Sequence, residues 1–284
     1  MKRHVTLAMI AVGVYFAGNL TSCTKIASEL PAPVASALTD SIAPSTDRIT
    51  LFYGQFAEVN DSIKITYNSL GNPVSMMGSK RTYEHLKHLF QYDANNRLTA
   101  IVGVGNESAP GYLMSAHKYL FDAQNRVITD SILSGISGGR YDTATLNTWG
   151  TTPIFTDEIS YDSRNRITKV LRKQHASGPD TLNYTYYYNG AGNLYKINRS
   201  YINKDSAPYY LMSFDEFFSY DSQVNPHQLH PIWQLIDRNY SKNNAFGQNP
   251  YTVKGYPMFL NSTTSHSTDF LLYNYRNLTI NYSN

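Results

Sequence analysis

The sequence predicts an all-β protein: an antiparallel meander of repeated hairpins curled into a barrel or barrel-like sheet, with a short helix near the C-terminal third. Two observations predict the sheet. Apolar and polar side chains alternate with a period of two, and a turn motif recurs every 25 to 40 residues. A third observation is the 24 tyrosines among 284 residues, because aromatic residues favour strands.

The first element, residues 1–22, is expected to be a lipoprotein signal peptide. After a basic start, Val5–Ala17 is almost wholly apolar and is shorter than the roughly 20 residues that span a bilayer. The stretch Leu20-Thr21-Ser22-Cys23 ends in the only cysteine and resembles the bacterial lipobox. That resemblance implies cleavage before Cys23 and a lipid anchor on its sulfur. The alternative is a secretory signal followed by an unrelated cysteine.

The second element, residues 23–48, is expected to be a flexible tether, because it is rich in Ala, Ser and Pro and lacks periodicity. It would hold a single β-repeat domain, residues 49–284, away from the membrane. Thr24 is not the Asp that often signals retention at the inner membrane, so an outer-membrane lipoprotein of the cell envelope is expected. Whether it faces the periplasm or the surface stays open.

The β-repeat domain contains six copies of one motif: an aromatic residue, Asp or Asn, two variable residues, Asn or Gly, a further residue, and an aliphatic residue. The anchor aromatics are Tyr67, Tyr92, Phe121, Tyr161, Tyr188 and Tyr220. The Asp or Asn is expected to accept backbone hydrogen bonds, and the Asn or Gly to adopt a positive φ. Each copy therefore predicts strand, three-residue turn with a bulge, strand. A degenerate seventh copy is expected to start at Tyr273, and about a dozen strands should result.

Two segments interrupt the repeat. Residues 134–157 are expected to form a long loop, and Pro231–Asp237 a short helix with Pro at its first turn. Trp149 in the loop and Trp233 in the helix are candidate binding residues, because Trp combines a flat apolar body with a polar tip.

A membrane-spanning porin is not expected. The side chains predicted on the outer face of the sheet include Lys64, Lys118 and Asp130, and charges there are costly in lipid. Removal of Lys2 and Arg3 with the signal peptide leaves a net charge of +1, so the chain lacks the basic surface that nucleic-acid binding requires.

The repeated aromatic-Asp unit resembles the YD repeats of Rhs and teneurin-type proteins. The chain is also similar, over roughly residues 50–284, to Gram-negative lipoproteins that carry a domain of unknown function with a porin-like fold. The residues behind this second resemblance are Tyr220-Asp221, Asn225-Pro226, Leu229–Leu235 and Asn243-Asn244. It implies a fold and a location, and no activity.

No motif for catalysis or cofactor binding is present: there is no Gly-x-Ser-x-Gly, no Ser-x-x-Lys, no P-loop and no dinucleotide fingerprint. His85 and His88 would point to opposite faces of a strand. His227 and His230 lack a third ligand. No cofactor and no metal are therefore expected.

A pattern of Asp, Ser or Thr, then a small or aliphatic residue resembles the O-glycan acceptor motif of some Gram-negative envelope proteins. The acceptors would be Ser41, Ser62, Ser131, Thr143, Thr181 and Ser206. Asp-Ser also forms turns that begin strands, so both interpretations stay open.

The function expected is that of a non-catalytic, lipid-anchored envelope protein that binds a glycan or a partner protein. One alternative is a hydrolase or lyase acting on envelope polysaccharide. The other is a carrier that holds an apolar ligand in the barrel lumen.

Overall fold

The computed structural model describes residues 46–56, 59–80, 87–105, 113–134, 153–175, 181–202, 211–246, 250–260, 268–273 and 275–283. The first strands are β1 (Arg48–Phe56), β2 (Val59–Tyr67), β3 (Pro73–Gly78), β4 (Lys87–Tyr92), β5 (Leu98–Val104), β6 (Leu113–Phe121) and β7 (Val127–Ser134). Then follow β8 (Phe155–Tyr161), β9 (Ile167–Gln174), β10 (Thr181–Tyr188), β11 (Leu194–Ile202) and β12 (Leu211–Phe217). The remaining elements are η1 (Pro226–Leu229), α2 (Pro231–Asp237), β13 (Phe259–Leu260), β14 (Thr268–Asp269), β15 (Leu272–Tyr273) and β16 (Tyr275–Ser283).

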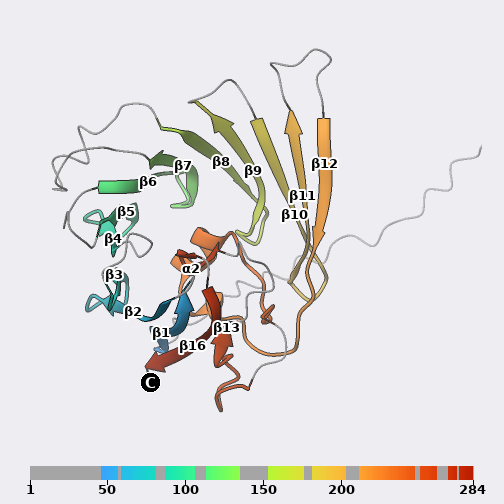
Figure 1. Ribbon diagram of the computed structural model, residues 1–284. Helices are drawn as coiled ribbons and strands as arrows, with labels where there is room; N and C mark the ends of the chain where they lie inside the picture. The colour runs from blue at the N-terminus through green and yellow to red at the C-terminus, as the bar shows by residue number, and fades with distance from the viewer. Residues whose placement is uncertain are drawn as a thin grey trace, which may run out of the picture. The chain divides into compact units, whose positions relative to one another are not determined.

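The predicted fold class is confirmed. In the described part of the chain, fourteen strands form one antiparallel sheet in which β1 to β12 follow each other as a meander. The last strand, β16, pairs with β1 and with β13, so the sheet ends at β12 on one side and at β13 on the other. The sheet curls around helix α2 without closing (Figure 1). Strands β14 and β15 form a separate two-stranded sheet.

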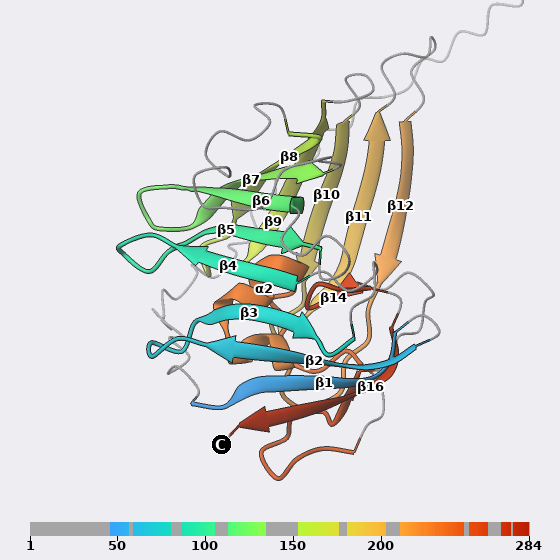
Figure 2. The ribbon, with the colours of Figure 1, turned by 60° about the vertical axis from the view of Figure 1, so that its left-hand side comes forward.

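The turn chemistry predicted from the motif is also confirmed. At the β4–β5 turn, Asp93 Oδ1 accepts hydrogen bonds from the amides of Asn95 and Arg97, each at 2.9 Å. Asn96 has a φ of 59°, and the Asp93 amide donates to the Arg97 carbonyl at 3.0 Å around a three-residue loop. The same backbone closure occurs in five of the six copies, which begin at Asn68, Asp93, Asp122, Asp162 and Asn189. Figure 2 shows the turns after β2, β4 and β6 side by side along one rim of the sheet.

Two copies differ from the prediction. The sixth, at Asp221, leads into η1 instead of closing a hairpin. The expected seventh copy is wrong, because the residues from Tyr275 onward form the single strand β16. A turn of the repeat type lies instead at Thr252–Tyr256, with Gly255 at a φ of 80°. The sequence pattern missed it because Thr replaces the usual Asp or Asn.

Tyrosine hydroxyls join five of the six repeats to the hairpin or strand before them. The anchor tyrosine of a repeat donates to the carbonyl of the residue that follows the preceding repeat's turn, or to the corresponding position in β1. These bonds are Tyr67 to Ile49 (2.6 Å), Tyr92 to Pro73 (2.6 Å), Tyr161 to Val127 (2.7 Å), Tyr188 to Ile167 (3.0 Å) and Tyr220 to Leu194 (2.6 Å). The turn arginine also covers the next anchor ring, as Arg166 does over Tyr188 at 4.1 Å. The motif therefore specifies contacts between repeats as well as the turn itself.

The predicted helix is confirmed as α2, and its ends have clear causes. Pro231 occupies the first turn, and His230 Nδ1 accepts a hydrogen bond from the Ile232 amide at 3.2 Å. The helix ends at Arg238, which adopts the left-handed conformation with a φ of 54°. Trp233 is fully buried and contacts Phe90 edge-on, with ring centres 5.9 Å apart. Burial of this apolar face against the inner side of the sheet fixes the position of α2.

Each bulge changes which side chains face inward. In β7 the pairing with β6 shifts register between Val127 and Thr129, so Val127 and Asp130 both lie on the inner face. Asp130 is 2% exposed, which corrects its predicted outward position. Lys64 and Lys118 do lie on the outer face as predicted. Each is on the strand before its turn, whereas the bulged residue is on the strand after the turn.

Candidate functional site

Two carboxylates face each other on the inner side of the sheet. Asp130 on β7 is directly opposite Asp157 on β8, and each is 2% exposed. Like charges in this arrangement repel, so cations are needed to hold them. Arg172 on β9 binds Asp157 through two hydrogen bonds, from Nε at 2.7 Å and from Nη2 at 2.9 Å. This bidentate geometry is the strongest form of the Arg–carboxylate pair.

The second cation comes from the helix. Arg238, the residue after α2, places Nη2 2.8 Å from Asp130 Oδ2 and 3.6 Å from Asp157 Oδ2. Burial lowers the pKa of Arg238, but Asp130 and other neighbours outweigh it and raise that pKa above its usual value. Burial likewise raises the pKa of Asp130, while His117 and Arg238 lower it below its usual value. Asp130 is therefore an ionised carboxylate at neutral pH.

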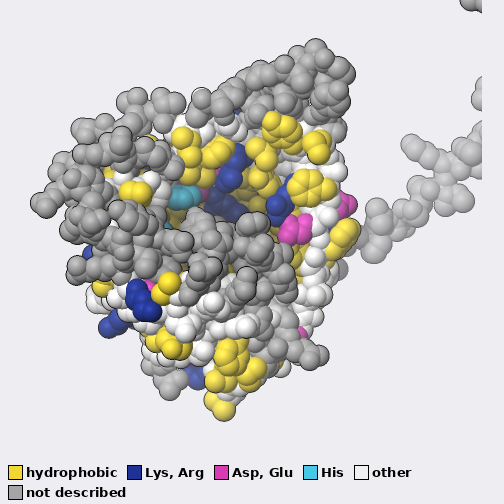
Figure 3. Space-filling view, viewed as in Figure 1, with side chains coloured by type: hydrophobic (Ala, Val, Ile, Leu, Met, Phe, Trp, Pro, Cys, Tyr) yellow, Lys and Arg dark blue, Asp and Glu magenta, His cyan; other side chains and the backbone are white. Residues whose placement is uncertain are grey.

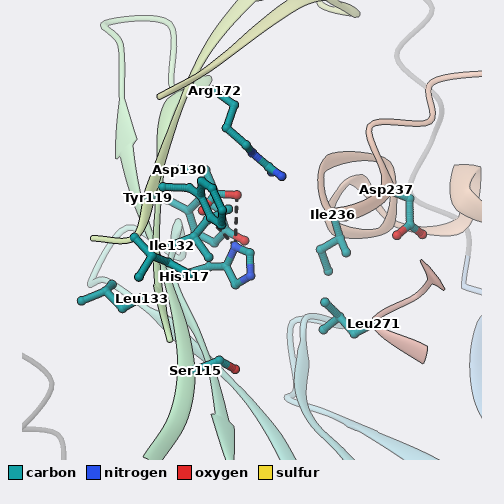
Figure 4. A pocket seen from close by; sticks show the side chains of 12 residues that line it. Ser115, His117, Tyr119, Asp130, Ile132, Leu133, Arg172, Ile236, Asp237 and Leu271 are labelled. Carbon is teal, nitrogen blue, oxygen red and sulfur yellow. Dashed lines mark hydrogen bonds and ion pairs between the residues drawn. The ribbon is translucent and has the colours of Figure 1, made fainter. Parts of the chain in front are cut away.

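His117 on β6 completes the network. Its Nδ1 lies 3.0 Å from Asp130 Oδ1 and 3.1 Å from Oδ2, so Nδ1 carries a hydrogen and donates to the carboxylate. The other edge of the ring faces a cavity (Figure 4). The network thus borders the cavity through His117 and Arg172.

This cavity has a volume of about 420 Å³. Ser115, His117 and Arg172 line it from the sheet, and Asp237 and Leu271 line it from the opposite side (Figure 4). Asp237 Oδ2 accepts hydrogen bonds from His227 Nε2 at 2.6 Å and from the Phe270 amide at 2.8 Å, which orients the carboxylate. Polar groups of both signs therefore converge on one space, alongside apolar side chains.

A row of alternating rings and guanidinium groups extends from the cavity across β8 to β12. Arg172 Cζ lies 5.3 Å from the ring centre of Phe155 and 6.0 Å from that of Tyr184. Arg199 Cζ lies 5.8 Å from Tyr184 and 5.8 Å from Phe214. We call these five residues the aromatic–guanidinium row. They share the inner face because Tyr184 pairs with Arg199, and Arg199 with Phe214.

The row is partly open to solvent. Phe214 is 56% exposed, and the side chains of Arg199 and Arg172 are 39% and 30% exposed. Both guanidinium groups are already paired, Arg172 with Asp157 and Arg199 with Glu216. Hydrophobic and basic side chains gather in a hollow of this face over β8–β12 (Figure 3). The surface is therefore aromatic and rich in hydrogen-bond donors, but its charge is largely balanced.

The sequence-predicted site residues lie elsewhere. Trp233 is in the core, and its burial favours a packing role over contact with a ligand. Ser62, Ser131 and Thr181 are partly exposed in strands, and their neighbours in register place them on the outer face. Trp149, the lipobox with Cys23, Ser41, Thr143 and Ser206 lie outside the described residues. Their proposed roles stay predictions.

His88, weighed as a metal ligand, lies on the inner face of β4. Burial lowers its pKa to about 4, with a further contribution from His117. Within the described ranges, no group of three or more His, Cys, Asp or Glu side chains is placed to hold a metal ion. In the same part of the chain, no helix has the length and apolarity needed to cross a membrane.

Sequence reasoning missed the aromatic–guanidinium row, although a signal for it exists. Tyr184 and Tyr186 lie two residues apart on the predicted inner face of β10. The same alternation along β9 and β11 places Arg172 and Arg199 on that face, provided that the bulged residue after each turn is counted. Asp130 was missed for the same reason. Asp157 was missed because residues 134–157 were expected to form a loop, whereas residues 155–157 belong to β8. Arg238 carries no such signal, because its position depends on where α2 packs.

Comparison with known proteins assigns no family. No family model and no curated protein match the chain. A DUF3836 family protein from Bacteroides vulgatus is 14% identical with a TM-score of 0.23, over 36% of this chain and 97% of its own. A chain in the crystal structure of TcdB2-TccC3-Cdc42 is 13% identical with a TM-score of 0.32, over 74% of this chain and 10% of its own length. At these scores neither structure indicates a function.

Proposed function

We propose that the chain is a non-catalytic binding protein of the cell envelope that holds a glycan on the inner face of its curled sheet. The aromatic–guanidinium row carries this proposal. Sugars bind to proteins through stacking of their apolar faces on aromatic rings and through hydrogen bonds to polar groups, and the row offers both. Adjacent strands are about 4.8 Å apart, and Tyr184 and Phe214 lie level with each other on alternate strands, so these two rings recur at about 10 Å. This spacing suits every second sugar unit of an extended oligosaccharide. Phe155 lies further along its strand and joins the row through its contact with Arg172.

The cavity next to the row supports a polar ligand. Arg172 keeps one terminal nitrogen beyond its two bonds to Asp157, and it borders both the cavity and the row. Ser115, His117 and Asp237 add further donors and acceptors. An apolar ligand would leave the hydrogen-bonding capacity that remains on these groups, such as the third nitrogen of Arg172, unused, at a cost of roughly 1–3 kcal/mol for each buried donor or acceptor. This argues against the carrier alternative.

The converging carboxylates do not favour the hydrolase alternative. A glycosidase needs one carboxylic acid that stays protonated until it donates. The lowered pKa of Asp130 keeps it ionised, and Asp157 is held by two hydrogen bonds from Arg172. Both carboxylates therefore serve to hold the arginines in place.

A glycan array tests the proposal. The purified protein is expected to bind a subset of oligosaccharides, and Tyr184→Ala and Phe214→Ala to weaken that binding at least tenfold. Phe217→Ala is the matched control, because Phe217 is 69% exposed on the same strand but faces outward. Binding that survives both inner-face substitutions, or that is lost equally in the control, would contradict the site. Absence of any glycan ligand would contradict the function.

Membrane attachment through Cys23 is a separate part of the proposal and rests on the lipobox resemblance. Cells that express the protein and are fed a clickable fatty acid should label it, and Cys23→Ala should abolish the label. Label retained on Cys23→Ala would show that the anchor is elsewhere. Intact mass of the natural protein additionally tests the six O-glycan acceptors: a mass equal to the lipidated chain alone would exclude them.

A further inference from the structure

The edge strand β12 has apolar side chains exposed on both faces. Met212 and Phe214 on the inner face are 64% and 56% exposed, and Phe217 on the outer face is 69% exposed. β12 is the last strand of the sheet at this end, and no described strand pairs with its free side. It lies at the right of Figure 1. An uncovered apolar edge is a template for pairing with another strand.

The backbone of β12 is suited to such pairing. The Phe218 amide donates to the Tyr195 carbonyl at 3.1 Å, and hydrogen-bonded positions alternate along an antiparallel pair. The amides of Ser213, Asp215 and Phe217 therefore point away from β11. The β11–β12 register is continuous from Ile202 to Lys196, and β12 itself contains no Pro, Lys or Arg. The strand therefore lacks a bulge, Pro and Lys, and its only charged residues are Asp215 and Glu216.

The acidic side chains of β12 do not oppose pairing, because β11 already neutralises them. Asp215 accepts from Asn198 Nδ2 at 2.7 Å and from Lys196 Nζ at 3.4 Å. Glu216 pairs with Arg199. The partner strand therefore does not need basic side chains to balance Asp215 and Glu216. A second copy of β12, which has no basic residue, meets this condition.

We propose that β12 pairs antiparallel with β12 of a second copy of this chain, with Phe214 on the two-fold axis. Phe214 is the midpoint of Leu211–Phe217, so this register pairs the whole strand. It places Ser213, whose amide points away from β11, opposite Asp215 of the other copy, whose amide does the same. The two residues can then exchange backbone hydrogen bonds, as the alternation along an antiparallel pair requires. A register centred on Asp215 or Glu216 would instead set like charges opposite each other.

This pairing joins the aromatic–guanidinium rows of the two copies. Phe214 ends the row in each copy, and in the proposed register the two Phe214 rings are direct neighbours across the axis. The inner faces then form one surface across both sheets. The dimer does not depend on the identity of the ligand, so dimerisation and glycan binding can fail separately.

Cysteine crosslinking of the purified full-length protein in solution tests the register. In a Cys23→Ala background, Phe214→Cys places two thiols at a pair with Cα atoms about 4.5 Å apart, which a disulfide can bridge. A mild oxidant is expected to convert most of this variant to a covalent dimer on a non-reducing gel. Phe217→Cys is the control, because the proposed register sets Phe217 opposite Leu211. No dimer at position 214, or equal dimer at 214 and 217, would overturn the proposal.

Proline substitutions test the strand pairing itself. Ser213→Pro, added to Phe214→Cys, removes an amide that points away from β11 and should reduce the crosslinked fraction at least tenfold. Ser213→Ala keeps the amide and should leave that fraction unchanged. Asp215→Pro removes a second outward amide and should act like Ser213→Pro. Circular dichroism checks that each variant is folded, and a folded proline variant that still crosslinks fully would overturn the proposal.

Discussion

Phe121 is the one anchor aromatic among the six that has no hydroxyl, and this makes a stabilising substitution predictable. The other five donate to a backbone carbonyl at 2.6 to 3.0 Å. Four of the five acceptors directly follow the preceding turn, and the corresponding residue for position 121 is Leu98, after Arg97. Phe121→Tyr is therefore expected to add the missing hydrogen bond between the β6–β7 hairpin and the β4–β5 hairpin.

The expected gain is about 0.5–1.5 kcal/mol, the usual net contribution of one hydrogen bond. The ring itself already packs on the core and lies 5.0 Å from the Arg97 guanidinium, so packing is unchanged by the added oxygen. Urea denaturation measures the free energy of unfolding, and the midpoint should rise with no change in slope.

Tyr161→Phe is the matched control, because it deletes the equivalent bond to Val127 at 2.7 Å and should destabilise by about 1 kcal/mol or more. If Phe121→Tyr lowers the unfolding free energy while Tyr161→Phe also lowers it, the Leu98 carbonyl is not placed as the repeat implies. If neither changes it, the hydroxyl bonds contribute nothing to stability, and the reasoning from the repeat is refuted.

Three further predictions concern stability. Burial, with a contribution from Arg48, lowers the pKa of His230 to about 4, below its unfolded value near 6.5, so stability should be lost as pH falls from about 6.5 toward 4. This loss is up to about 3 kcal/mol, and urea titrations of wild type and His230→Asn should differ in pH dependence over that interval. Asp130→Asn removes one partner of a buried ion network and should cost about 3–5 kcal/mol, whereas Lys173→Ala in the exposed pair with Glu158 should cost less than about 1 kcal/mol by the same assay. Asn165 has a φ of 58°, which Ala adopts less readily than Asn or Gly. Asn165→Ala should therefore lower the unfolding free energy by about 1 kcal/mol, and Asn165→Gly should change it little. Equal losses in the two variants would show that the Asn side chain, and not the backbone angle, matters.

Much of the fold was predictable because its determinants are local. Asp93 and Asn96 act within one turn, and Pro231 and His230 within one helical turn. Such short-range chemistry depends only on neighbouring residues, so a pattern repeated along the chain predicts repeated hairpins. The meander follows because consecutive hairpins pair with each other.

The candidate site was less predictable, because it depends on register. One bulged residue beside each turn moves Asp130 from the outer face to the inner face. The alternation in sequence alone gives the opposite assignment, and the error propagates to every residue after the bulge. Once the register is known, Asp157, Arg172 and the aromatic–guanidinium row follow.

By itself, the sequence determined the strands, the turns and the helix of this protein, since each rests on contacts between residues close in the chain. Only the tertiary structure decided three features: the pairing of β1 with β16, the entry of Arg238 between Asp130 and Asp157, and the free edge at β12. Each of these joins residues far apart in sequence or follows from how far the sheet curls. Packing of the whole chain sets these distances, and no local pattern encodes them.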